Sequence, residues 1–526
     1  MIAASPPPAQ PPNTRQIPRW PGWLCLVPAL LLLLFQLVVP SVRVLVASFQ
    51  SGGAFEPASF VGLQNYQQLF GADASAWVPT VIIAIVIMVV AWVPALLIGI
   101  LGGRATGWQA VLIRIGLAAM LVCYAPASMA VLLIDNPSAG SPPGSYLLVI
   151  GLYLPIVVAG TAVIALAVFA DGVGPGVPAA AALAGFGLLA SIAWALQLVD
   201  PALILGSGAV GRSPAATSWQ LGLVRFDFGL GQAQNALVLI VLGVLGLLAT
   251  LLILISRIEI DLAPSTSSTS VRPAPVAAVA AVLATAVVLL LMLIMNREWV
   301  AGLFQLKTEL IRQVGPEQVL KVIVNTWVPP LLATLPQVAV AVAAGAAIGL
   351  FRPFGRHSRW ILLAFAPWLF TGIQPLLLIY FADLSRLGLL NLWIDLVPRI
   401  WVVGPAVIAF SLLFDGVRRH REATGSYRGS TVVIAGLALL IAAVLMIVQS
   451  QALGWVLAVA LSPELMNGSG FLFQMVHQVF GQADAVLTWL SFPLPLVVLV
   501  GAAVAVGMIL FTGVRISAFG RVGGNR

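Results

Sequence analysis

Twelve long apolar runs constrain the fold of this 526-residue chain more than any other feature. A helix needs about 20 apolar residues to cross the hydrocarbon core of a bilayer. The runs are continuously apolar, whereas strands of a membrane β-barrel alternate apolar and polar residues. We therefore predict an all-α polytopic membrane protein with about 12 transmembrane helices. The predicted spans are 22–48, 78–102, 110–134, 146–170, 178–199, 234–256, 275–296, 324–350, 359–382, 396–414, 431–449 and 489–512.

Composition excludes the other broad classes. Hydrophobic residues make up 61% of the chain and charged residues 8%, whereas soluble domains are about a quarter charged. Disorder requires low hydrophobicity and high net charge. The two cysteines, Cys25 and Cys123, lie in apolar runs, and the three histidines are far apart in sequence. We therefore expect no disulfide framework, no metal site and no cofactor.

The distribution of charge predicts the orientation in the membrane. With twelve spans both termini lie on one side, and that side carries 16 of the 25 basic residues and 5 of the 17 acidic ones. Basic residues mark the cytoplasmic side. We predict a bacterial plasma (inner) membrane protein with both termini in the cytoplasm, and we interpret the net charge of +8 as a topology signal, so we expect no nucleic acid partner.

A polar stretch near the middle of the chain predicts two halves. Residues 258–275 are rich in Ser, Thr and Pro and follow the sixth span, as expected of a flexible linker. The predicted halves, each with six spans, are 21–257 and 276–519. Residues 1–20 are Pro-rich and predicted to be a disordered cytoplasmic N-terminus, and residues 520–526 form a cytoplasmic tail.

Polar side chains within the apolar runs are the first candidates for function, because their burial is costly. Six amides lie in or at the ends of these runs: Gln197, Asn235, Gln337, Gln374, Gln449 and Gln451. Amides can hydrogen-bond the hydroxyl groups of a sugar, or they can join helices to one another. The sequence has no Walker A, HExxH or GxSxG motif, so we expect no catalytic residues and no enzymatic activity of its own.

Several segments resemble a known family. The first half opens with PGWLCLVPALLLLLFQLVVPSVRVLVASF and FVGLQNYQQLF and closes with TSWQLGLVRFDFGLGQAQNALVLIVLGVL. The second half contains NTWVPPLLATLPQVAVAVAAGAAIGLFRPFGR and FTGIQPLLLIYFADLSRLGLLNLWIDLVPRI. In order and spacing these segments resemble the permease subunits of maltose/glycerol-phosphate-type sugar ABC importers. The chain is thus similar to two such permease subunits fused into one.

The resemblance implies a function and partners. It implies a binding-protein-dependent importer for a sugar or related solute, with an extracytoplasmic solute-binding protein and separate cytoplasmic ABC ATPase subunits that hydrolyse ATP. The solute pathway would be the cavity between the two halves, near the middle of the bilayer. The candidate pathway residues are Gln337, Gln374 and Tyr380 from the second half and Asn235 from the first.

The cytoplasmic coupling segments depart from the family pattern. Family members carry an "EAA" motif in a short helix that docks on the ATPase. Residues 171–177, DGVGPGV, contain no such motif, and residues 415–430, DGVRRHREATGSYRGS, keep only a remnant. The candidate coupling residues are Glu422, Ala423, Arg419 and Arg421, although the arginines also fit simple cytoplasmic anchoring.

These eroded motifs leave a second hypothesis open. A degenerate permease-like protein would serve as a structural or accessory subunit of a larger membrane assembly, without ATP coupling. A secondary carrier is less favoured, because the span centres nearly lack ionisable residues.

Overall fold

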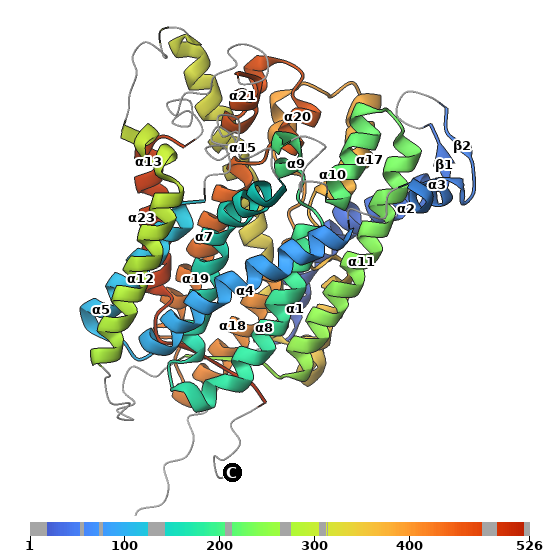
Figure 1. Ribbon diagram of the computed structural model, residues 1–526. Helices are drawn as coiled ribbons and strands as arrows, with labels where there is room; N and C mark the ends of the chain where they lie inside the picture. The colour runs from blue at the N-terminus through green and yellow to red at the C-terminus, as the bar shows by residue number, and fades with distance from the viewer. Residues whose placement is uncertain are drawn as a thin grey trace, which may run out of the picture.

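A computed structural model describes residues 18–52, 57–72, 77–124, 142–205, 213–262, 275–304, 312, 314–475 and 492–519. The predicted all-α class is confirmed: helices form most of this part of the chain, and the strands form two small antiparallel ribbons (Figure 1). Most of the predicted N-terminal segment, the tail 520–526 and residues 263–274 of the predicted linker lie outside the described residues.

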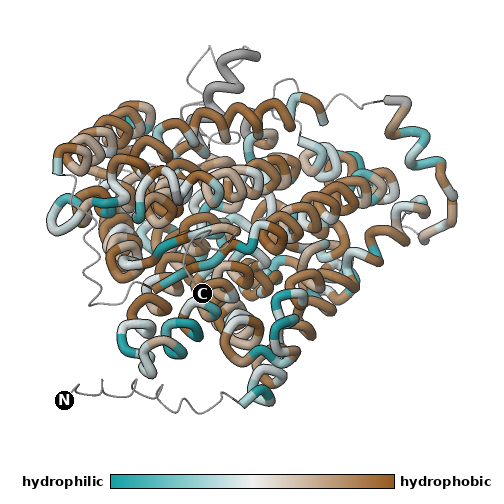
Figure 2. The backbone as a smooth tube through the Cα atoms, turned by 90° about the horizontal axis from the view of Figure 1, so that it is seen from below, coloured by the Kyte–Doolittle hydropathy of each residue, from teal (hydrophilic) through white to brown (hydrophobic). Residues whose placement is uncertain are grey.

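Seven helices in the described part of the chain are long and apolar enough to cross a membrane. The first is a composite of α1 (Trp20–Leu33), a π-helical turn η1 (Leu34–Val38) and α2 (Val39–Ala47). The others are α4 (Trp77–Gly102), α8 (Val173–Ala195), whose candidate span Gly176–Leu203 extends past its end, α11 (Phe228–Ile255), α12 (Pro275–Met295), α15 (Pro316–Ala346), which continues into η5 (Ala347–Phe351), and α19 (Ser430–Ser450). Figure 2 shows that the helical tubes are mostly hydrophobic. The chain is therefore a multi-pass membrane protein.

Three shorter apolar helices coincide with further predicted spans. They are α5 (Gly107–Val122), the apolar part of α7 (Pro142–Val168), and α23 (Leu494–Leu510). Together with the seven long helices they account for ten of the twelve predicted runs. Residues 125–134 of the third run lie outside the described residues.

The predicted spans 359–382 and 396–414 are wrong as continuous transmembrane helices. The first is divided into short helical pieces, with a non-helical break at Thr371–Gly372. Pro367 and Pro375 lie on either side of this break, and proline removes a backbone donor and clashes with the preceding turn. In the second, α18 (Gly404–Thr424) begins eight residues late, with Pro405 in its first turn, and continues to Thr424.

Most of the short elements gather at one end of the molecule, at the top of Figure 1. Here β1 (Gln50–Ser51) pairs with β2 (Ser59–Phe60), and the charge distribution predicts that this end is external. The helices at this end include α3 (Gln64–Ala72), α9 (Asp200–Leu205), α10 (Pro214–Trp219), α17 (Leu377–Arg386), α20 (Gly454–Val459) and α21 (Gly468–Gln474). The remaining pieces are α13 (Arg297–Phe304), α16 (Leu362–Phe365), η4 (Gln220–Val224), η6 (Gly355–Ile361), η7 (Ala366–Trp368), η8 (Gln374–Leu376), η9 (Trp393–Leu396) and η10 (Pro463–Leu465).

The opposite, predicted cytoplasmic end contains the second ribbon. Strand β3 (Glu259–Leu262) pairs antiparallel with β4 (Val514–Ser517), with Asp261 opposite Arg515. The first residues of the predicted linker are thus a strand rather than a tether. Because β3 follows the first half and β4 ends the second, this ribbon joins the two halves.

The halves also interlock through the first span. Helix α1 packs against α15 and η5 of the second half, and the Trp23 ring meets the Phe354 ring edge-on at 4.9 Å between centroids. The Arg43 guanidinium makes two hydrogen bonds of 2.6 Å to the Asp383 carboxylate. The core that contains α1 therefore includes residues from both halves.

Candidate functional site

A cavity of about 570 Å³ lies between the two halves. The first half contributes residues of α7, α8 and α9, and the second contributes residues of α15, α19 and the non-helical segments near 369–374 and 398–403. The breaks in the second half thus supply backbone at the cavity wall. Non-helical backbone at membrane depth is tolerated where it is buried in protein or lines a cavity.

Three amides at the cavity, Gln197, Gln337 and Gln449, hydrogen-bond neighbouring segments of its wall. Gln197 donates to the carbonyls of Ala193 and Phe370 at 2.8 Å each, and its Oε1 accepts from the Gly372 N–H at 2.7 Å. Gln337 donates to the Ile400 carbonyl at 2.8 Å and accepts from Gln449 Nε2 at 2.9 Å. Gln197 and Gln337 therefore stabilise the cavity wall, which is the alternative role that the sequence left open.

Three oxygen atoms of residues that line the cavity have no hydrogen-bond partner among the described residues. They are Oγ1 of Thr371, a residue that is 8% exposed, Oε1 of Gln374 and Oε1 of Gln449. Thr371 and Gln374 lie beside the break between α16 and α17. A buried polar atom without a partner is costly. These three atoms are therefore the ones best suited to bind a polar ligand.

Charged and aromatic groups complete the lining. Asp200 at the start of α9 accepts from the N–H groups of Leu453 and Gly454, at 3.3 and 2.9 Å, across the boundary between the halves. Arg399 pairs with Asp395 at 2.5 Å. The rings of Trp194, Phe370 and Trp455 also line the cavity. The cavity thus combines amide and hydroxyl groups with aromatic faces.

The four predicted pathway residues separate into two pairs. Gln337 and Gln374 line the cavity, whereas Tyr380 and Asn235 are not among its lining residues. The Tyr380 hydroxyl donates to the Gln36 carbonyl at 2.8 Å, which joins α17 to the π-helical turn of the first span. Asn235 is 0% exposed on α11, and its amide atoms have no partner among the described residues.

The predicted coupling residues lie on the last two turns of α18 and not in a loop. Arg419 pairs with Asp415, Glu259 and Asp261, at 2.9, 3.2 and 3.1 Å. It is therefore held within the chain, against β3. Such internal pairing differs from the exposure expected of a docking side chain.

The other three coupling candidates lie nearer the surface. Glu422 pairs with Arg418, and its side chain is 56% exposed. Ala423 is exposed, and Arg421 donates to the Tyr427 hydroxyl at 2.6 Å and stacks over its ring. Of the four candidates, Glu422 and Ala423 are the most accessible to a partner.

The corresponding segment of the first half, residues 171–177, lies at the start of an apolar helix. Asp171 pairs with Arg515 of β4 at 2.9 Å, and α8 begins two residues later, at Val173. Residues 171–172 thus lie in the turn between α7 and α8, and residues 173–177 are the first residues of α8.

Comparison with known proteins does not assign the chain to a family. No protein-family model matches the sequence, and no curated protein is significantly similar to it.

The sequence prediction missed several residues that line the cavity. Asn325, Thr371, Arg399 and Asn467 are among them, and so is Asp200. Asp200 follows the fifth apolar run immediately, and an ionisable residue at a span end was an available signal. Thr371 carries no such signal, because its exposure to the cavity depends on the break in the helix.

Proposed function

We propose that this protein is the membrane-spanning permease of a transporter for a small polyhydroxylated solute, a sugar or a related compound. The observation that carries the proposal is the cavity between the halves, with its unpartnered oxygens on Thr371, Gln374 and Gln449. Hydroxyl and amide groups hydrogen-bond a sugar as donors and acceptors, and a volume of about 570 Å³ lies within the usual range for small-molecule sites.

The energy source that we propose is a separate ATPase. The resemblance to sugar ABC importer permeases implies two cytoplasmic ATPase subunits and an external solute-binding protein. The exposed end of α18, with Glu422 and Ala423, is the surface that we propose for ATPase docking. The resemblance and the exposure of these two residues support this part of the proposal.

Transport is tested by uptake into cells that express the protein with its chromosomal neighbours, using a panel of labelled sugars. Thr371→Val and Gln374→Leu are expected to reduce uptake about tenfold, because each removes a hydrogen bond worth about 1.4 kcal/mol. The matched control is Gln232→Leu, since Gln232 is a buried amide with an unpartnered oxygen that does not line the cavity. Equal loss in all three variants would exclude the cavity as the solute site.

A structural role in a larger assembly is the second candidate function. It is favoured by the internal pairing of Arg419 and by the short turn, containing residues 171–172, that precedes α8. Purification in mild detergent separates the two candidates. Recovery of a stoichiometric ATPase supports the permease, and recovery of other membrane subunits without an ATPase supports the structural role.

A further inference from the structure

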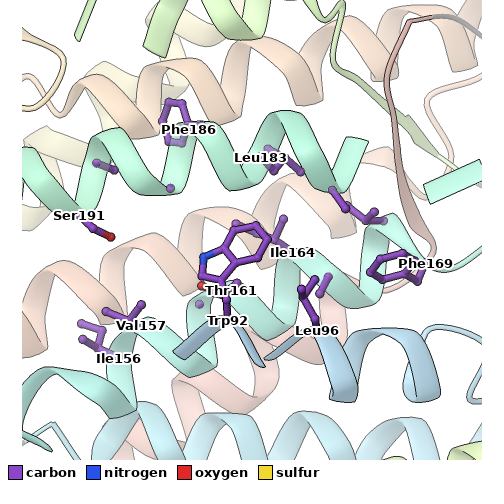
Figure 3. Close-up of a pocket in the computed structure, with 16 residues that line it drawn as sticks. Trp92, Leu96, Ile156, Val157, Thr161, Ile164, Phe169, Leu183, Phe186 and Ser191 are labelled. Atoms are coloured by element: carbon purple, nitrogen blue, oxygen red, sulfur yellow. The ribbon is translucent and has the colours of Figure 1, made fainter. Parts of the chain in front are cut away.

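A second hollow lies between α4, α7 and α8, and it shares the α8 residues Phe186 and Ala190 with the lining of the central cavity. It has a volume of about 270 Å³ and is lined almost entirely by apolar side chains. Figure 3 shows Trp92 across its middle, Ile156 and Val157 toward one end, and Phe169 toward the other. We call it the α4–α7–α8 groove. The groove lies on the apolar parts of three membrane helices, so its surroundings are the hydrocarbon chains of the bilayer.

The dimensions of the groove suit a single acyl chain. Ile156 and Phe169 are 13 positions apart on and just beyond α7, which is about 20 Å along a helix. One leaflet contributes about half of the 30 Å hydrocarbon core. An engineered apolar cavity of about 150 Å³ already holds benzene, so this larger volume can take a segment of acyl chain.

The open side of the groove faces outward. Ile164 is 43% exposed, and Gly160, one helical turn before it, is also exposed. A side chain added at Gly160 would meet no described atom within 4 Å. A chain from the bilayer can therefore enter sideways along α7 without displacing protein atoms.

A basic group lies at the predicted cytoplasmic end of the groove. Arg104 is exposed, and its Nη2 donates to the Asp171 carbonyl at 3.3 Å, in the turn that follows Phe169. Arg515 lies at the same turn and pairs with the Asp171 carboxylate. Two arginines and one aspartate leave a net charge of +1 here, which favours an anionic head group at the membrane surface.

We propose that the α4–α7–α8 groove is a binding site for an anionic phospholipid of the cytoplasmic leaflet. One acyl chain lies in the groove beside Trp92, and the phosphate lies at Arg104. The inner end of the chain reaches Ile156 and Val157, one turn from Tyr153, whose ring meets the Trp194 ring at 4.1 Å between centroids. Both of those aromatic residues line the central cavity, so the lipid supports the wall that separates the cavity from the bilayer.

The site is tested by photolabelling in phosphatidylcholine vesicles that contain phosphatidylglycerol with a diazirine in one acyl chain. Mass spectrometry of the labelled protein is expected to find adducts within residues 156–191. Gly160→Leu fills the groove and should reduce that labelling about tenfold, because the loss of two buried methylene groups changes an affinity by about this factor. Ile164→Trp, at the rim of the groove, should also reduce that labelling.

Matched controls separate the groove from general contact with lipid. Gly174→Leu also places a side chain where no described atom lies within 4 Å, but outside the groove, and should leave labelling unchanged. Arg104→Gln should lower labelling by the phosphatidylglycerol probe and not by the same probe with a choline head group. Arg356→Gln, an exposed arginine elsewhere on the predicted cytoplasmic side, should lower neither.

Two outcomes overturn the proposal. Undiminished labelling of 156–191 in both Gly160→Leu and Ile164→Trp excludes an acyl chain in the groove. Equal labelling by the glycerol and choline probes in the unaltered protein excludes selection of an anionic head group. Neither readout depends on solute uptake, so the groove is tested independently of the proposed permease function.

Discussion

The Asp415 carboxylate is 1% exposed and accepts hydrogen bonds from Arg352, Arg359, Arg418 and Arg419. Burial by itself raises the pKa of this carboxyl group, but the positive charges of Arg359, Arg352 and Arg419 outweigh it, and the pKa is lowered from its ordinary value of 3.8. A lowered pKa contributes stability that is complete above pH 3.8 and is lost as the pH falls through the folded-state value.

Replacing this carboxylate should destabilise the protein strongly. Asp415→Asn leaves four arginines without their shared partner, and breaking a buried ion pair costs about 3–5 kcal/mol. We expect a lower thermal unfolding temperature in detergent at pH 7. We also expect that temperature to fall less as the pH is lowered below 3.8. Asp261→Asn is the control, because that side chain is 48% exposed and its pair is worth about 1 kcal/mol or less. Similar thermal unfolding temperatures for the two variants would contradict the central role of Asp415.

Asn235 provides a second test at the level of a single residue. Its buried amide has no hydrogen-bond partner among the described residues, and such a group costs about 1–3 kcal/mol. Asn235→Leu should therefore leave thermal stability unchanged or increase it, and it should leave solute uptake unchanged. A selective loss of uptake at normal stability would restore Asn235 as a pathway residue.

At several glycines, two elements pack so closely that a larger side chain would not fit between them. A Cβ at Gly99 of α4 would lie 2.3 Å from the Ala165 Cβ of α7, and one at Gly416 of α18 would lie 2.0 Å from the Ile260 carbonyl oxygen of β3. Small residues permit such contacts between membrane helices. Gly416 thus allows α18 to contact the ribbon that joins the halves.

The same substitution should have opposite effects at two glycines. Gly416→Ala forces β3 away from α18 and should cost about 1–3 kcal/mol, as overpacking does. Gly160→Ala meets no described atom and should add about 0.5–1 kcal/mol, because alanine is the better helix former. Thermal unfolding of both variants in one detergent checks the difference. An equal loss of stability in Gly160→Ala and Gly416→Ala would argue against the close contact of α18 with β3.

At the scale of elements, apolar length predicts where helices form but not where they break. Ten of the twelve apolar runs coincide with apolar helices, because burial in a bilayer depends on hydropathy. The run 359–382 is as apolar as many of the others, yet Pro367 and Pro375 divide it. Pro94 and Pro155 lie inside continuous helices. The sequence alone does not distinguish these cases, because neighbouring helices decide whether the freed carbonyls are satisfied.

Across the whole molecule, the two halves are held together by contacts far apart in sequence. The Arg43–Asp383 pair, the Tyr380–Gln36 hydrogen bond and the β3–β4 ribbon all join one half to the other. These contacts occur at both ends of the molecule. Their number and spread indicate that the interface does not require the covalent linker.

Dividing the chain should therefore preserve the assembly. When residues 18–262 and 275–519 are co-expressed as separate polypeptides with one affinity tag, we expect the untagged half to co-purify in mild detergent. The Arg43→Ala and Asp383→Ala variants should each reduce its recovery. Recovery of the tagged half alone in a monodisperse form would contradict an interface of this strength.

The location of the candidate site was predictable from the sequence only in part. Gln337 and Gln374 both line the cavity, and buried amides in apolar runs need partners or ligands. Asn235 satisfies the same criterion and Tyr380 is also a polar side chain in an apolar run, but both lie elsewhere. The side on which a polar residue faces depends on the rotation of its helix, and an apolar run with a small amphipathic signal leaves that rotation undetermined.

The packing of α1 against α15 and η5 also has a consequence for synthesis. The first span is complete at Ala47, whereas η5 ends at Phe351, about 300 residues later. At about 5–20 residues per second, translation needs about 15–60 s to cover that distance. During this interval Arg43 has no Asp383 carboxylate to pair with. The first span therefore completes its packing only after most of the chain has been made.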